Sequence, residues 1–295
     1  MDIGIRMYRL GAVLPGIVLS ATLLLVVSAM LPATIGGLLL VGYVAAAVVL
    51  ATGALEEPAV QVLGHARGTT AGEELLLQGL AEWLAARGQT VPDLYVGRSD
   101  RGRPAAEPVG RRSVVIAPRM LGWLHREQVS QAVVATVVAQ AAAGLRVGPS
   151  RFDLAVRLLT APGAMVVAGF LRVARWFTWV PGVLGLWRIR VIFGVVAVWQ
   201  CLQAHQVTIA VTTGVMIAVS YSAPACARAW RRRSEAAADE LVASQGLGEH
   251  LEFAVRSADE PGSIDRVDRI RRAALAAAMA GHDEAPSRRP LYVVR

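Results

Sequence analysis

The sequence predicts a mainly α, polytopic helical membrane protein of about four spans with a small α+β cytosolic domain. Hydrophobic residues make up 55% of the 295 positions and charged residues only 18%, whereas soluble domains carry about 25% charged residues. No charged residue occurs from Leu10 to Leu55 or from Val191 to Ala227. This composition favours a membrane protein and excludes a disordered or collagen-like chain.

Residues 1–55 are predicted to form an N-terminal transmembrane hairpin. The charge-free segment is long enough for two spans of about 20 residues, and Pro32 with Gly36 offers a turn between them. A cleaved signal peptide is the alternative, but the apolar segment continues through a second span. Arg6 and Arg9 precede the first span, so we expect a multi-pass protein of the plasma (inner) membrane with a cytoplasmic N-terminus.

Residues 56–152 are predicted to form the first part of a cytoplasmic domain, because their polarity is mixed. Leucines at helical spacing and short β-prone segments alternate in this part of the chain. The expected elements are a helix over 73–87, strands at 94–96 and 113–117 joined by a polar loop over 97–112, and an apolar helix over 128–145.

Residues 153–227 are predicted to form the second transmembrane region, for which two topologies are open. The first places spans at 156–176 and roughly 200–227, which leaves a group of arginines outside, against the positive-inside tendency. The second makes 191–227 a tight hairpin whose arms are short for a bilayer. We favour the first topology.

The chain is expected to return to the cytoplasm at Arg228, where four arginines lie within six residues. Residues 228–280 are predicted to supply the second part of the cytosolic domain, and residues 281–295 a flexible tail. The net charge of +8 comes from arginine alone, and no nucleic-acid-binding motif accompanies it. We therefore expect the lipid bilayer as a partner and no nucleic acid.

Several short motifs follow one another in a definite order between residues 60 and 275. Pro92-Asp93-Leu94-Tyr95-Val96 precedes an apolar strand, and a helix opening at Leu124 leads into Thr136-Val137-Val138-Ala139-Gln140. Arg232-Arg233-Ser234-Glu235-Ala236-Ala237-Ala238-Asp239 and the pair Arg269-Ile270 come later. In order and spacing these motifs resemble the integral-membrane zinc metallopeptidases of the M48 family, the HtpX and Ste24 type. The resemblance implies a zincin-type metallopeptidase fold for the cytosolic domain.

This chain has Thr136, Val137 and Gln140 where the family has its His-Glu-x-x-His motif. Two histidines four residues apart can bind one zinc ion, and the glutamate activates the bound water. Threonine is a poor ligand, a glutamine amide suits harder ions than zinc, and valine cannot accept a proton. The resemblance places the third ligand at Glu235, the one remaining metal candidate, and a supporting carboxylate at Asp239. We therefore expect no zinc, no other cofactor and no catalytic residue.

The degenerate motif also predicts a partner cleft. Three polar contacts are expected: from Thr136 to the carbonyl four residues earlier, from Gln140 to Glu235 or Arg232, and from Asp239 to Arg232 or Arg233. The family cleft binds peptide as an added strand, so the strand holding Val114, Val115 and Ile116 is expected to offer a docking edge. The cleft for substrate or partner would then comprise these three residues with Thr136, Gln140, Glu235 and Asp239.

These expectations lead to three hypotheses of function. The first is a membrane-embedded M48-like pseudopeptidase that acts as a scaffold, adaptor or regulator and binds a membrane protein or an extended peptide. The second is an active metalloendopeptidase with a non-standard metal site that includes Glu235. The third is a transport or lipid-binding protein in which His205, predicted to lie inside a span, contributes a polar lining.

Overall fold

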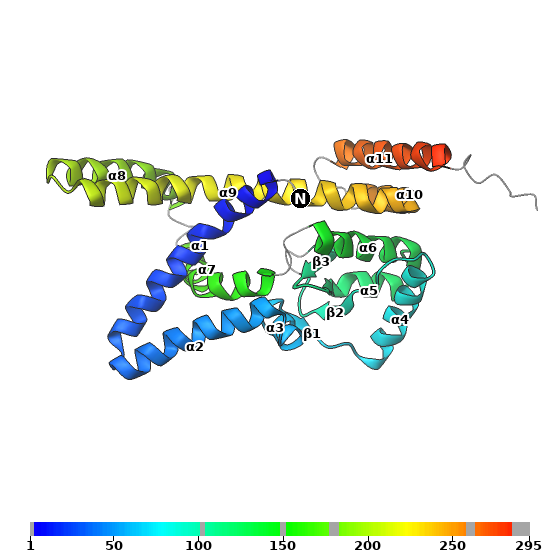
Figure 1. Cartoon of the computed structure of the whole chain (residues 1–295), viewed down its shortest axis with the longest axis horizontal. Helices are drawn as coiled ribbons and strands as arrows, with labels where there is room; N and C mark the ends of the chain where they lie inside the picture. Colours follow the sequence, from blue (N-terminus) through cyan, green and yellow to red (C-terminus); the bar gives the residue numbers. More distant parts are fainter. Residues whose placement is uncertain (1–2, 101–103, 148–151, 177–182, 258–262, 285–295) are drawn as a thin grey trace, which may run out of the picture. The chain divides into compact units, whose positions relative to one another are not determined.

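The protein is mainly helical, with a small β-sheet (Figure 1). The computed structural model describes residues 3–100, 104–147, 152–176, 183–257 and 263–284. The chain forms two compact units. The helical unit consists of Met1–Ala54 and Leu154–Arg232, and the sheet unit consists of Leu55–Asp153 and Arg233–Arg295.

The helical unit contains most of the apolar residues of the chain. Its helices are α1 (Ile3–Met30), α2 (Ala33–Thr52), α7 (Asp153–Trp176), α8 (Val183–Gln203) and the first part of α9 (Val207–Val242). Among the described residues, three helices are long and apolar enough to cross a membrane: α1, α2 and the helix that begins at Val207. The expected fourth span over 156–176 is helical as α7, but α7 is not among these three. Its sequence includes Arg157, Arg172 and Arg175, which lower its hydropathy.

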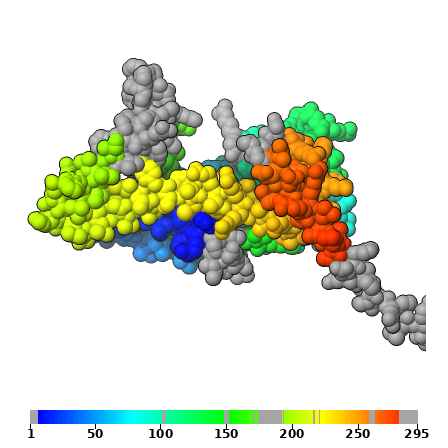
Figure 2. Space-filling model, turned by 90° about the horizontal axis from the view of Figure 1, so that it is seen from above, coloured from blue at the N-terminus to red at the C-terminus, as the bar shows by residue number. Residues whose placement is uncertain are grey.

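Helices α8 and α9 form a helical hairpin in the second apolar region, so the helix expected over roughly 200–227 begins only at Val207. Helix α8 ends at Gln203, and α9 begins at Val207. His205 lies in the turn between them with a positive φ of 58° and is exposed, so it does not lie within a helical span. Gly194 of α8 lies directly against Ile217 of α9. Figures 1 and 2 show the two arms side by side.

Pro162 makes α7 depend on its two neighbouring helices. Proline has no N–H, so Pro162 cannot donate to the carbonyl of Leu158 four residues earlier. The hydroxyl of Tyr43 on α2 donates to that carbonyl at 2.6 Å. One residue beyond the proline, the N–H of Gly163 donates to the buried hydroxyl of Ser20 on α1 at 2.9 Å. In an apolar environment backbone groups must find a partner within the protein, and these two bonds connect α7 to α1 and α2.

Tyr43→Phe should lower the stability of the helical unit, because it leaves the Leu158 carbonyl without its partner. Hydrogen bonds between membrane helices contribute about 0.6 and at most about 1.7 kcal/mol, and we expect a loss in that range by thermal unfolding in detergent. The matched control is Thr212→Val, since the Thr212 hydroxyl donates within its own helix, to the carbonyl of Thr208. Equal losses in the two variants would contradict the role given to Tyr43.

The sheet unit surrounds a four-stranded mixed sheet with the strand order β1-β2-β4-β3. Strands β2 and β4 are parallel, and β1 and β3 are antiparallel edge strands. Helix α6 packs against β3, β4, α4 and α10, so it lies at the centre of the unit. The elements are α3 (Glu56–Leu63), β1 (Ala66–Arg67), α4 (Ala71–Ala85), β2 (Asp93–Gly97), β3 (Ala106–Val109), β4 (Ser113–Ile116), α5 (Pro118–His125), α6 (Gln131–Val147), the π-helical turn Ala243–Leu247, α10 (Gly248–Ser257) and α11 (Ser263–Glu284).

Strand β3 lies within the segment 97–112, which was expected to be a loop. Gly110, with a φ of 76°, turns the chain back so that β3 pairs with β4. The N–H of Ala117 donates to the carbonyl of Ala105, so these two residues form a hydrogen-bonded pair of the antiparallel ladder. Hydrogen-bonded and non-hydrogen-bonded pairs alternate along such a ladder, which makes Pro108 and Val114 a non-hydrogen-bonded pair, and the nitrogen of Pro108 therefore points away from β4. A proline is tolerated in an edge strand in this orientation.

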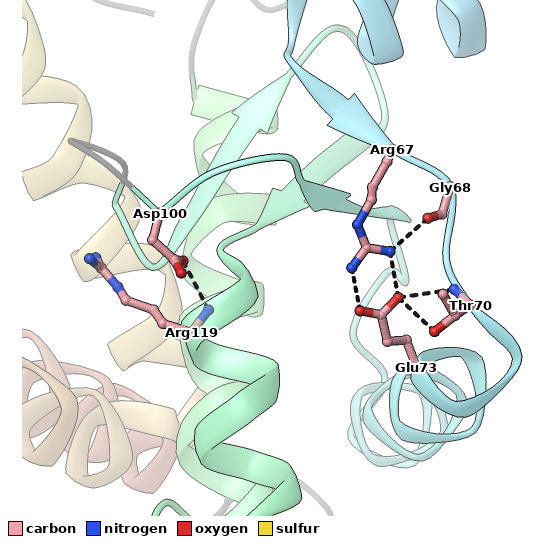
Figure 3. A network of polar contacts seen from close by, with 6 residues as sticks. All are labelled: Arg67, Gly68, Thr70, Glu73, Asp100 and Arg119. Carbon is pink, nitrogen blue, oxygen red and sulfur yellow. Dashed lines mark hydrogen bonds and ion pairs between the residues drawn. The ribbon is translucent and has the colours of Figure 1, made fainter.

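Two carboxylates position helices at the rim of the sheet (Figure 3). The carboxylate of Glu73, in the first turn of α4, accepts hydrogen bonds from the two terminal guanidinium nitrogens of Arg67 at 2.5 and 2.7 Å. It also accepts hydrogen bonds from the backbone N–H and the hydroxyl of Thr70, both at 2.9 Å, which closes a capping box. Asp100 accepts the N–H of Arg119 at 2.9 Å, at the start of α5.

The α4 cap should weaken in acid. The hydrogen bonds from Arg67, with smaller contributions from Thr70, lower the pKa of Glu73 from 4.5 to about 2. A carboxyl whose pKa is lowered by folding stabilises the folded state above the unfolded pKa, and this contribution disappears as pH falls from about 4.5 toward 2. Glu73→Gln should remove that pH dependence and cost about 1 kcal/mol at pH 7, measured by unfolding and by amide exchange in the first turn of α4. Glu74→Gln, which changes the exposed neighbouring carboxylate, should leave both unchanged; a loss as large as that of Glu73→Gln would contradict the assignment.

Candidate functional site

Helix α6 places Thr136 and Gln140 one turn apart on the same side. Thr136 is fully buried, and its hydroxyl donates to the carbonyl of Ala132 at 2.7 Å. This contact confirms the predicted bond to the carbonyl four residues earlier. The hydroxyl hydrogen of Thr136 is thus donated within its own helix, an arrangement typical of threonines buried in helices.

Asp239 joins three helices through its carboxylate. Its Oδ1 accepts hydrogen bonds from Gln140 Nε2 of α6 at 2.6 Å and from Arg266 Nη2 of α11 at 2.9 Å. Its Oδ2 accepts from Arg266 Nε at 2.8 Å. The Asp239 side chain is 1% exposed and that of Arg266 20%. A buried carboxylate requires such pairing, and the two-pronged contact with a guanidinium is among the strongest pairings available.

The partners in this network differ from those expected. A polar contact at Gln140 was predicted with Glu235 or Arg232, and the structure places Asp239 there instead. The predicted salt bridge of Asp239 was with Arg232 or Arg233, but its ion-pair partner is Arg266. Glu235, one turn earlier on α9, is exposed.

Arg266 is the residue that sequence reasoning missed. The pair Arg269-Ile270, near the end of the chain, belongs to the motifs that resemble the M48 family. Ile270 is buried, and Arg266 lies four residues before it, on the same face of α11. That spacing is the signal that identifies Arg266 as the arginine facing the core. The M48 resemblance also places Glu260 and Pro261 at a His-Pro pair of the family, and both lie outside the described residues.

The docking edge predicted at Val114, Val115 and Ile116 is wrong. These residues form β4, which pairs with β2 on one side and with β3 on the other, and their side chains are buried. Their backbone groups belong to the ladders and cannot receive an added strand. The edge on this side of the sheet is β3, where the nitrogens of Ala106 and Pro108 face outward and that of Pro108 has no hydrogen to donate.

The chemistry of the site is that of a structural contact. Val137 has no group that exchanges protons, and Thr136 and Gln140 are neutral. Both oxygens of Asp239 already accept hydrogen bonds. In the part of the chain that the structure describes, no three His, Cys, Asp or Glu side chains lie close enough together to hold a metal ion.

Comparison of the chain with protein-family models, curated proteins and solved structures gives no match. The M48 resemblance therefore stays a prediction from the sequence motifs.

Removing the Asp239 carboxylate should destabilise the sheet unit strongly. Asp239→Ala leaves the Arg266 guanidinium and the Gln140 amide without their partner, and breaking a buried ion pair in this way typically costs about 3–5 kcal/mol. Chemical unfolding of the detergent-purified protein measures the loss. Glu235→Ala, one turn away on the same helix, is the control and should cost less than about 0.5 kcal/mol.

The double variant Asp239→Leu with Arg266→Met separates the ion pair from general packing. Replacing both partners of a buried pair by apolar residues is often neutral, so this variant should recover much of the stability lost in Asp239→Ala. A double variant as unstable as Asp239→Ala would show that the contact contributes through something other than the pairing of charge.

Proposed function

We propose that this chain is a membrane-embedded, M48-like pseudopeptidase. In this view it acts as a scaffold, adaptor or regulator that binds a membrane protein or an extended peptide. The observation that carries the proposal is the closed contact of Gln140, Asp239 and Arg266 at the degenerate motif. The residue at the second histidine position donates to a protein carboxylate, where the family would use it to hold zinc.

This contact would replace the structural role of a metal ion. A zinc ion in a zincin-type site binds side chains from separate helices and so fixes their positions. Here the carboxylate of Asp239 connects α6, α9 and α11 by hydrogen bonds. The fold could therefore be retained after the ligands were lost, while the general base was replaced by Val137. A protein with the frame but without the catalytic groups is suited to binding.

The proposed setting is the plasma (inner) membrane, with the sheet unit in the cytoplasm. Three apolar helices support a membrane location. Four arginines at 228–233 follow the apolar part of α9 directly, and arginines at such a border favour the cytoplasmic side. A multi-pass protein with a cytoplasmic binding domain could hold another membrane protein near the bilayer.

Restoring the motif tests the proposed frame. The variant Thr136→His, Val137→Glu, Gln140→His should bind about one zinc per chain, because it recreates two imidazoles four residues apart with Glu235 as third ligand. Zinc would be measured in detergent-purified protein after dialysis, beside circular dichroism as a check of folding. Adding Glu235→Ala to the triple variant should remove the zinc.

A protease assay completes the test on the unmodified chain. With zinc added, the native protein should not cleave unfolded casein above the level of a buffer control. Cleavage that a chelator abolishes would refute the pseudopeptidase proposal. A folded triple variant that binds no zinc would refute the M48-like frame.

A further inference from the structure

The sheet unit has a cleft on the side of the sheet opposite β3, away from the degenerate motif. Its volume is about 480 Å³, within the range of about 300–1,000 Å³ typical of ligand clefts. Helix α3 lines it with Glu56, Glu57 and Gln61, and strand β2 lines it with Leu94 and Tyr95. The cleft thus combines a sheet edge with polar side chains of a neighbouring helix.

The backbone of β2 is open along this cleft. Strand β1 pairs with β2 only at Ala66 opposite Gly97 and Arg67 opposite Val96. The N–H of Asp93 donates to the carbonyl of Arg112, the residue before β4, so by alternation the N–H and C=O of Leu94 point to the side of β1. No hydrogen bond from another described residue reaches them. An extended peptide that continues the position of β1 would meet one free donor and one free acceptor there.

The cleft is negatively charged. Its lining contains the three carboxylates of Glu56, Glu57 and Asp93 against the one guanidinium of Arg112, a formal charge of −2. Glu56 is buried and accepts hydrogen bonds from the N–H groups of Arg111 and Arg112 and from the Ser113 hydroxyl, at 2.8–3.1 Å. Asp93 forms an ion pair with Arg112.

Glu57 is therefore the carboxylate left for a ligand. It is exposed and makes no hydrogen bond or ion pair with any residue that the structure describes. Burial raises the pKa of the nearby Tyr95 hydroxyl, and the charges of Glu57, Asp93 and Glu56 raise it further. The same negative potential favours a cationic ligand over an anionic one.

We infer that this cleft binds an extended peptide carrying a basic side chain, which adds to the open edge of β2 and pairs with Glu57. Backbone hydrogen bonds to Leu94 would give affinity for an extended segment of any sequence. The exposed carboxylate would select arginine or lysine, and the Tyr95 ring provides a surface for the cation. The inference deepens the proposed binding function and rests on it, because it names the surface and the charge of the partner.

The experiment uses the full-length protein in a non-ionic detergent and two labelled synthetic peptides. One alternates arginine with valine and the other alternates glutamate with valine; fluorescence anisotropy reports binding. We expect the arginine peptide alone to bind, and Glu57→Gln to weaken it roughly fivefold, the effect of one exposed ion pair of about 1 kcal/mol. Glu74→Gln, an exposed carboxylate on α4 outside the cleft, is the control and should bind as the native protein does.

A backbone variant tests the strand addition separately from charge. Leu94→Pro removes an N–H that faces the cleft and not β4, so the parallel ladder of β2 and β4 is kept and peptide binding should fall. Equal affinity of Glu57→Gln and Glu74→Gln, binding of the glutamate peptide, or no binding of either peptide would overturn the inference. Its failure is distinguishable from that of the proposed function, because zinc and protease activity are measured on the same preparation and do not involve this cleft.

Discussion

The buried carboxylate of Asp239 is the interaction on which the sheet unit depends. A carboxylate at 1% exposure is costly unless hydrogen bonds compensate it, and here the compensation comes from two other helices. Arg266 and Gln140 must therefore both contact Asp239 when the core of the sheet unit packs during folding. The requirement fixes the positions of α6, α9 and α11 more narrowly than apolar packing among small residues such as Ala135 and Ala238 would.

In the helical unit, too, buried polar groups find hydrogen-bond partners on other helices, but there the groups are neutral. Pro162 leaves a carbonyl without its helical partner, and the hydroxyl of Tyr43 supplies a donor from another helix. Ser20 is used in the same way by the N–H of Gly163. In both units a polar group that local structure cannot satisfy is satisfied by a distant segment, which makes the tertiary arrangement specific.

Sequence reasoning predicted the elements that depend on local pattern. The apolar segments, the strands at Leu94 and Val114 and the bond within the helix from Thr136 all follow from composition, periodicity or spacing over four residues. Strand β3 was missed because Pro108 is unfavourable in a strand, except where its nitrogen faces outward from an edge. The break at His205 was missed because neither glycine nor proline marks it.

The candidate site was predicted only in part, because its contacts join segments far apart in the chain. That Gln140 would need a polar partner follows from its place on an apolar helix. Which carboxylate meets it, and that Arg266 meets the same carboxylate, depends on how α9 and α11 pack. The strand at Val114 was expected to be an edge because the resemblance implied a cleft that binds peptide as an added strand, and its pairing with β2 and β3 depends on segments elsewhere in the chain.

The central claim is that hydrogen bonds occupy the position where the M48 family holds zinc. The most direct measurement is the metal content of the native detergent-purified protein, by elemental mass spectrometry, beside the Glu235→Ala variant. The account predicts well below one zinc per chain in both proteins. About one zinc per chain in the native protein that is lost in the variant would contradict the account and favour an active metalloendopeptidase.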